Sequence, residues 1–409
     1  MSPLSRAVRW SRTRAGRLGL EAVRRVWALV PRGDGFVVYP GAPLDLNGLA
    51  LVAAGLQRGQ QPVLLVDDEV PMTRVRNTLQ SVGVAPDGVE VLRRRSPRGL
   101  LAYFRAATLM FTHVPNGGVT PPANRLVVNV WHGDGAKGFT ARDQAVTRRA
   151  SDVVVSGTRL GGEVKAAAFN LRPEDLLLTG NPRISLYRRP LDDDALAAMG
   201  LEPGIPVVLW APTYRATGGT NAWSDSSRTD AFTSTLADGG RALQQAARSA
   251  GRQIVLRPHP RDRVTFEGTV FPVITDDVLG AVGGNMYTFL PRVAAMITDY
   301  SSLWADYLVL DRPMGFFCPD LAEYEDGRGL DGEFSRELPG PLLQTDDELL
   351  AFLSAAELDS PEQRAVRSRC AEWIGLVQAT SPAEDLISWA FDGPRRATRR
   401  ARPVRAARS

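Results

Sequence analysis

The segment that decides the fold reads AAMITDYSSLWADYLVLDRPMGFF, from Ala294 to Phe317. It opens with a short apolar run, is interrupted by a polar turn at 298–302, and resumes at 303–310 with apolar residues at helical spacing. A second apolar run, 314–317, follows the turn at Asp311. Both runs have the length and the bounding residues of buried strands. The segment therefore predicts strand, turn, helix and strand, which is one βαβ crossover of a parallel sheet.

The turn is the first candidate for chemistry. It lies at the carboxyl end of the predicted strand and opens the helix, where unpaired backbone N–H groups and the helix dipole favour an anion. Ser301 and Ser302 add hydroxyl donors without bulk. Two interpretations stay open: an anion-binding turn, or an ordinary helix start in which Ser301 is the N-cap.

Outward from this segment, short apolar runs alternate with amphipathic stretches along most of the chain. The strands predicted in the first part are Phe36–Tyr39, Val63–Val66, Val89–Leu92, Leu109–Phe111, Leu126–Val130 and Val153–Val155, with helices at Asn47–Gln57 and Gly161–Phe169. The second part adds strands Val207–Trp210, Ile254–Leu256 and Phe271–Ile274, and helices Ala242–Ala250, Asp346–Ala355, Pro361–Leu376 and Ala383–Phe391. Such alternation predicts parallel sheets covered on both faces.

A chain of 409 residues is too long for one ordinary core. We expect a basic N-terminal segment (1–34), a Rossmann-like domain (35–187), a linker (188–204), a second Rossmann-like domain with closing helices (205–393) and an Arg-rich, disordered tail (394–409). Open α/β domains bind ligands at the carboxyl ends of their strands, so the expected site is the cleft between the two domains.

Composition excludes several classes of protein. A hydrophobic content of 44% with 23% charged residues indicates a globular chain and excludes disorder throughout. The net charge of +4 is segregated: residues 1–34 carry +6 and residues 394–409 carry +7, which leaves −9 for the body. The only cysteines, Cys318 and Cys370, form neither a disulfide framework nor a metal cluster, and a cytoplasmic location fits best.

The N-terminal segment contains a predicted helix at 17–30. No apolar run near it approaches the roughly 20 residues that a membrane-crossing helix needs. One interpretation places Val23, Val26, Trp27 and Val30 on a face that lies on an anionic membrane surface. The alternative is a helix packed on the first domain. For the tail, attraction to membranes and to nucleic acid both stay open.

Histidine is scarce, with three in the chain, so each one is informative. His132 follows a strand and lies in a Gly-rich loop, where a backbone can approach a ligand closely. His259 lies between two prolines at another strand end, whereas His113 is either functional or a strand-end histidine. Lys137, one of two lysines, is a candidate cation beside a phosphate in the His132 loop. Metal-binding, Walker and GxGxxG motifs are absent from the sequence.

Several short motifs, in order, resemble those of the CDP-glycerol glycerophosphotransferases of teichoic acid and capsule synthesis, which have a GT-B fold. The matching motifs are Trp131-His132-Gly133, Gly180-Asn181-Pro182-Arg183, Ala211-Pro212-Thr213-Tyr214-Arg215, Arg257-Pro258-His259-Pro260, Ile297 to Ser302, Asp306-Tyr307, Asp320, Tyr324, Arg328-Gly329 and Pro339-Gly340-Pro341. The chain departs from the family pattern at Asp134, where the family usually has Thr, and at Ile184-Ser185, which replace an acidic-polar pair. The resemblance runs from about Leu126 to Leu353.

The resemblance implies an α/β protein of GT-B type that transfers glycerol phosphate, or a related polyol phosphate, from a CDP-activated donor to an acceptor hydroxyl and releases CMP. It implies His132 as the base and His259 at the donor phosphates. The donor-side candidates are Arg257, Thr298, Ser301, Ser302, Arg328, Pro212 and Thr213. Acceptor-side or supporting candidates are Trp131, Gly133, Asp134, Lys137, Arg183, Arg215, Asp299 and Asp306.

The expected partners are the CDP-polyol donor, a lipid-linked or polymer acceptor and the inner face of an anionic membrane, with no nucleic acid, cofactor or metal. Two other functions stay open: a GT-B glycosyltransferase that uses a nucleotide sugar, and a non-catalytic binder of anionic polymers driven by the Arg-rich ends.

Overall fold

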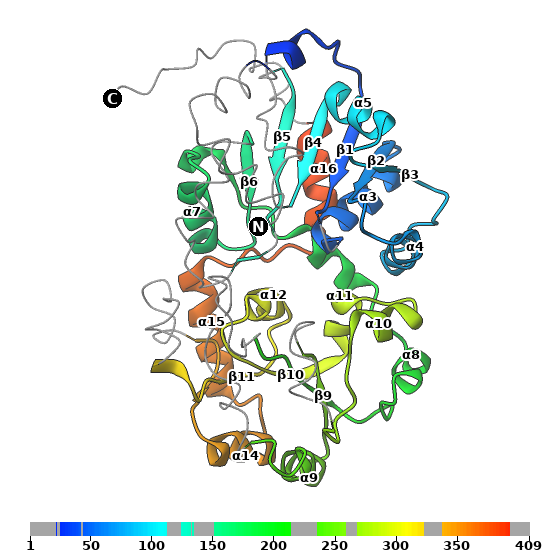
Figure 1. Ribbon diagram of the computed structural model, residues 1–409. Helices are drawn as coiled ribbons and strands as arrows, with labels where there is room; N and C mark the ends of the chain where they lie inside the picture. The colour runs from blue at the N-terminus through cyan, green and yellow to red at the C-terminus, as the bar shows by residue number, and fades with distance from the viewer. Residues whose placement is uncertain are drawn as a thin grey trace.

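The computed structural model describes residues 22, 25–41, 44–112, 124–131, 133–134, 151–213, 235–258, 268–322 and 338–392. Within these ranges the chain forms two lobes, each built on its own sheet (Figure 1). Every strand pair in both sheets is parallel, as the alternating pattern predicts. The α/β class is confirmed.

The first sheet has the order β3-β2-β1-β4-β5-β6-β7. Its strands are β1 (Phe36–Tyr39), β2 (Pro62–Val66), β3 (Glu90–Arg93), β4 (Thr108–Phe111), β5 (Leu126–Asn129), β6 (Val153–Val155) and β7 (Leu176–Leu177). The described helices between them are α3 (Leu46–Gln57), α4 (Met72–Ser81), α5 (Pro97–Arg105) and α7 (Arg159–Ala168). Side chains of Asp45, Ser96 and Thr158 cap α3, α5 and α7. Successive strands are added on one side of β1 up to β3 and on the other side from β4 onward, so the strand order reverses between β1 and β4, as in other doubly wound sheets.

The second sheet has the order β12-β11-β10-β8-β9. Its strands are β8 (Val207–Trp210), β9 (Gln253–Leu256), β10 (Val293–Thr298), β11 (Met314–Phe317) and β12 (Leu342–Leu343). Its described helices are α8 (Asp193–Ala198), α9 (Arg241–Ser249), α10 (Asp276–Ala281), α11 (Met286–Phe289), α12 (Leu303–Tyr307), α14 (Asp346–Ser354) and α15 (Pro361–Ile374). The reversal falls between β8 and β10, so their carboxyl ends flank the crevice where such sheets bind ligands.

The segment quoted first forms the predicted crossover. Strand β10 pairs in parallel with β11, and α12 connects them. The helix is shorter than its apolar pattern predicts, because it continues as a 3₁₀ turn over Leu308–Leu310 and ends at Asp311 in the left-handed region, with φ 47°. The crossover prediction is confirmed.

The sequence pattern was wrong about three strands: one predicted strand is almost absent, and two observed strands were not predicted. The predicted strand Phe271–Ile274 is a single bridge between Val273 and Leu256, because Pro272 has no N–H to extend the ladder. Strands β7 and β12 were not predicted, since two apolar residues form no pattern that can be distinguished from a loop.

The last helix, α16 (Pro382–Asp392), returns to the first lobe, where Figure 1 shows it in red beside β1 and α3. The Phe391 ring meets the edge of Phe36 at 5.2 Å. The Ser185 hydroxyl accepts from the Ala383 N–H and donates to Glu384, both at 2.9 Å. The sequence pattern placed this helix with the second domain; the structure places it on the first, so the chain crosses between the lobes twice.

The N-terminal helix is docked on the first lobe through Trp27, which is 1% exposed. The Trp27 indole N–H donates to the Phe104 carbonyl at 2.8 Å, and its ring packs on Tyr103 with centroids 5.1 Å apart. Val26 is 63% exposed, so the prediction that Val26 and Trp27 share a membrane-facing side is wrong. Burial of the large ring with its N–H satisfied sets the rotation of the helix. Val23 lies outside the described residues.

Candidate active site

The carboxyl ends of β8 and β10 are tied together by buried polar contacts. The Thr298 hydroxyl donates to the Ala211 carbonyl at 2.9 Å. After Pro212, the Thr213 backbone N–H donates to the Asp299 carboxylate at 2.9 Å and its hydroxyl does so at 2.5 Å. Asp299 is 1% exposed. These residues, predicted for the donor side or its support, fix the two loops at the switch point of the second sheet.

The turn after β10 meets the loop after β5 of the other lobe. A Cβ placed on Gly133 would lie 2.8 Å from the Ser302 hydroxyl oxygen, so the glycine backbone lies directly against this serine. Ser302 makes no side-chain hydrogen bond as the N-cap of α12, and the Ser301 hydroxyl accepts from the Leu303 N–H at 3.3 Å. The structure thus brings together two of the predicted motifs, one from each domain.

Asp306 on α12 is a buried acceptor for both lobes. Its carboxylate accepts from Arg183 at 2.6 Å, from the Tyr287 hydroxyl at 2.6 Å and from the Asn181 amide at 2.8 Å. The Arg183 guanidinium lies over the Tyr287 ring, 4.9 Å from its centroid. Burial alone would lower the pKa of Arg183, but the neighbouring acidic groups, Asp306 foremost, together outweigh burial and raise that pKa. Arg183 and Asp306 therefore hold the lobes together as an ion pair.

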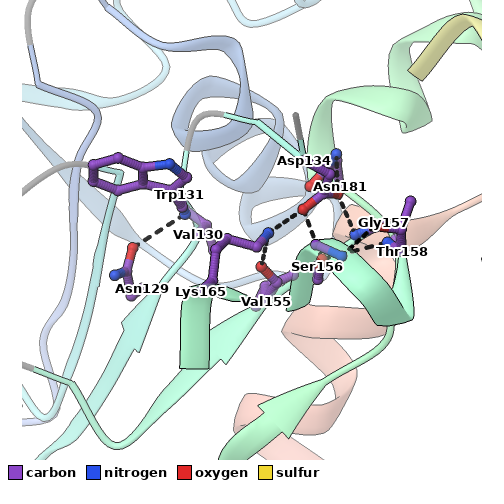
Figure 2. A network of polar contacts seen from close by, with 12 residues as sticks. Asn129, Val130, Trp131, Asp134, Val155, Ser156, Gly157, Thr158, Lys165 and Asn181 are labelled. Carbon is purple, nitrogen blue, oxygen red and sulfur yellow. Dashed lines mark hydrogen bonds and ion pairs between the residues drawn. The ribbon is translucent and has the colours of Figure 1, made fainter. Parts of the chain in front are cut away.

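Asp134 is buried and fully engaged with its own domain (Figure 2). Its carboxylate forms an ion pair with Lys165 and accepts from the Ser156 hydroxyl at 2.6 Å, the Gly157 N–H at 2.7 Å and the Asn181 amide at 2.9 Å. Burial opposes ionisation, but Lys165 and these donors outweigh it and lower the pKa of Asp134. Asp134 therefore supports the loop as a carboxylate.

The backbone of Trp131 is also anchored. Its N–H donates to the Asn129 side chain at 3.1 Å, and its carbonyl accepts from the Asn47 amide at 2.9 Å. The ring meets Phe169 edge-on at 5.1 Å. The Asn47 side-chain oxygen also accepts from the backbone N–H of Arg183 at 3.1 Å. Sequence reasoning missed Asn47, although a polar residue within the apolar pattern of α3 is a signal that could have found it.

Arg257, predicted to contact the donor phosphates, is bonded within the protein. Its guanidinium donates to Asp276 at 2.5 Å and to the Ile274 carbonyl at 3.0 Å. Arg74 of the first lobe lies 3.6 Å from the same aspartate. Arg257 thus lies near a second contact between the lobes, formed by α4 and α10.

The remaining predicted site residues, His132, His259, Lys137, Arg215 and Arg328, lie outside the described residues. So does His113. Among the residues that the structure does describe, no group of three His, Cys, Asp or Glu side chains could hold a metal ion. The expectation of transfer without a metal or cofactor stays a prediction. Within those same ranges, no helix has both the length and the apolar composition needed to cross a membrane.

The two doubly wound sheets, the returning helix α16 and a pocket lined by residues of both lobes, among them Asn181 and Asp306, define a GT-B type protein. The family model for CDP-Glycerol:Poly(glycerophosphate) glycerophosphotransferase matches residues 69–378. The chain belongs to this family, as its motifs predicted.

Curated relatives agree with this assignment, and a solved structure shares the fold. The teichoic acid poly(glycerol phosphate) polymerase of Bacillus subtilis (strain 168) is 25% identical over 312 residues, which cover 68% of this chain and 38% of that protein. The teichoic acid glycerol-phosphate transferase of Staphylococcus aureus (strain NCTC 8325 / PS 47) is 26% identical over 234 residues, which cover 53% of this chain and 54% of that protein. The chain thus spans about half or less of these relatives' lengths. The wall teichoic acid polymerase TagF shares the fold, with a TM-score of 0.66 at 18% identity over 94% of this chain and 96% of that one.

Proposed function

We propose that this protein transfers glycerol phosphate, or a related polyol phosphate, from a CDP-activated donor to an acceptor hydroxyl in wall or capsule polymer synthesis and releases CMP. The observation that carries the proposal is the contact of Gly133 with Ser302. It joins the residue after His132 to the serine turn of the second domain, so acceptor and donor groups can meet at one place. Family membership supports the same reaction.

The chemistry assigns a task to each domain. The acceptor O–H loses its proton to His132 while its oxygen attacks the phosphorus that adjoins glycerol. The bond from that phosphorus to the bridging oxygen breaks, and CMP leaves with this oxygen. A positioned imidazole typically contributes about 10²–10⁴-fold to such a proton transfer. His259, Arg328 and the Ser301 and Ser302 hydroxyls stabilise the phosphate charge.

A CDP-linked donor is supported by a TagF relative of the same fold, which was studied as a variant soaked with CDPG. In this chain, the Arg257 guanidinium already donates to Asp276 and to the Ile274 carbonyl, so a donor phosphate would bind its remaining N–H groups. The Ser302 hydroxyl makes no capping bond to α12, and a serine O–H at this turn can donate to a phosphate oxygen.

The test of the proposed function is a donor panel. The protein is incubated with an acceptor-bearing membrane fraction and with CDP-glycerol, CDP-ribitol or UDP-sugars in turn. We expect a CDP-polyol alone to release a nucleoside monophosphate and to extend the acceptor. Turnover of a UDP-sugar to a nucleoside diphosphate would instead identify a glycosyltransferase, and no turnover with any donor would leave the polymer-binding alternative.

We further propose that the enzyme works at the inner, anionic face of the membrane. Val26 and Leu29 are 63% and 82% exposed, three residues apart on the docked helix, within a segment of net charge +6. A shallow apolar contact and on the order of 1 kcal/mol per nearby Arg are together enough for reversible attachment. Trp27 takes no part in this contact, because it is buried in the first domain.

We expect the protein to sediment with anionic vesicles at low salt and to be released at high salt, because the Debye length falls from about 10 Å at 0.1 M to about 3 Å at 1 M. The double variant Val26→Gln/Leu29→Gln should lose most of this binding. A matched control is Ile205→Gln/Val270→Gln on the second domain, whose side chains are 38% and 40% exposed. Equal loss in both variants, or equal binding to neutral vesicles, would contradict the proposal.

A further inference from the structure

A buried polar chain joins the two domains behind the proposed site. It runs from Lys165 to Asp134, Asn181 and Asp306, each 6% exposed or less. The Asn181 amide nitrogen donates to the Asp134 carboxylate at 2.9 Å and to the Asp306 carboxylate at 2.8 Å. One amide group therefore uses both of its hydrogens to connect a loop of the first domain to helix α12 of the second.

The residues on both sides of His132, Trp131 and Gly133, are held in place by their neighbours. On one side, Trp131 is held by Asn47 and Asn129. On the other, Gly133 lies against Ser302, and Asp134 is held by four donors (Figure 2). The backbone that leads into and out of His132 thus has little freedom, and Asp134 provides most of the contacts on the second side.

The contacts of Asp134 require a carboxylate and cannot be made by an amide. One carboxylate oxygen accepts from Ser156 and Lys165, and the other accepts from Gly157 and Asn181. An asparagine has a single acceptor oxygen, so its NH₂ group would face either the Lys165 ammonium or two N–H donors. An ammonium with 1% exposure would also lose its counter-charge.

We propose that Asp134 is a positioning residue for the transfer reaction. Paired with Lys165 and bridged through Asn181 to Asp306, it fixes the loop that carries His132 against Ser302 of the second domain. The inference rests on the proposed function of His132, and it assigns Asp134 no contact with substrate. Asp134 and Lys165 act as a matched buried pair in this chain.

The test compares Asp134→Asn with Arg367→Met. Arg367 on α15 is a cation as buried as Lys165, and its guanidinium donates to Asp311 at 2.7 Å and to Asp359 at 2.6 Å. Thermal unfolding gives the folded fraction of each variant. We expect Asp134→Asn to lose about 10²-fold in kcat per folded molecule, the scale of a misplacement of about 1 Å, while KM for CDP-glycerol is unchanged. Arg367→Met should lose stability and keep kcat.

The double variant Asp134→Asn/Lys165→Met removes the unpaired ammonium and should recover part of the lost kcat. It also keeps the test open if the single variant fails to fold. An unchanged kcat per folded molecule in Asp134→Asn would overturn the proposal. So would the absence of recovery in the double variant, since the carboxylate would then act without Lys165.

A second measurement does not depend on activity. With three histidines in the chain, each imidazole signal can be followed by NMR and assigned by substitution. We expect Asp134→Asn to shift the His132 signal and to leave the other two in place. If the wild-type protein releases CMP from no CDP-polyol, the proposed function fails. The NMR result still decides the positioning claim, which is contradicted if the His132 signal does not move.

Discussion

His132→Ala is expected to abolish transfer while CDP-glycerol binding survives. The imidazole is assigned to the acceptor proton, whereas the donor is assigned to the second domain. Loss of the imidazole should therefore lower kcat and leave donor affinity close to wild type. A general base typically contributes about 10²–10⁴-fold. Turnover is measured as CMP release, and donor affinity by titration calorimetry with CDP-glycerol.

The matched control for this variant is His113→Ala, which removes another imidazole from the first domain. It should keep turnover near wild type if His113 is an ordinary strand-end histidine. A loss of CDP-glycerol affinity in His132→Ala equal to its loss of rate would place His132 in the donor site and refute its assignment as the base.

His259→Ala should weaken donor binding and turnover together. The residue is assigned to the donor phosphates, whose charge must be held both in the bound donor and as CMP leaves. Titration with CDP-glycerol and with CMP measures binding apart from turnover, and we expect both affinities to fall because the residue is assigned to a phosphate in each complex. If turnover stays within about tenfold of wild type, the mechanism with paired histidines is wrong.

Local patterns were enough to predict the α/β class with parallel sheets. The runs that became β10 and β11, with α12 between them, are contiguous in sequence, and their length and spacing are properties of that segment alone. The family motifs then predicted which strand ends matter. Gly133 and Ser302, from two of these motifs, lie in contact.

What the sequence did not show depends on contacts between distant residues. Lysine scarcity drew attention to Lys137, in a Gly-rich loop, yet Lys165 is the lysine paired with Asp134, 31 residues away in the chain. That contact exists because β5 and β6 are neighbours in the sheet, which run lengths do not determine. Likewise, the rotation of the N-terminal helix depends on the space available for Trp27 beside Tyr103.

In the proposed reaction, the phosphate next to glycerol moves with the glycerol. The most direct measurement follows that phosphorus, using CDP-glycerol labelled with ³²P only at the glycerol-linked phosphate. We expect the label to enter the acceptor product in equal amount with glycerol and the released nucleotide to be unlabelled CMP. Label retained in released CDP, with glycerol transferred alone, would contradict it.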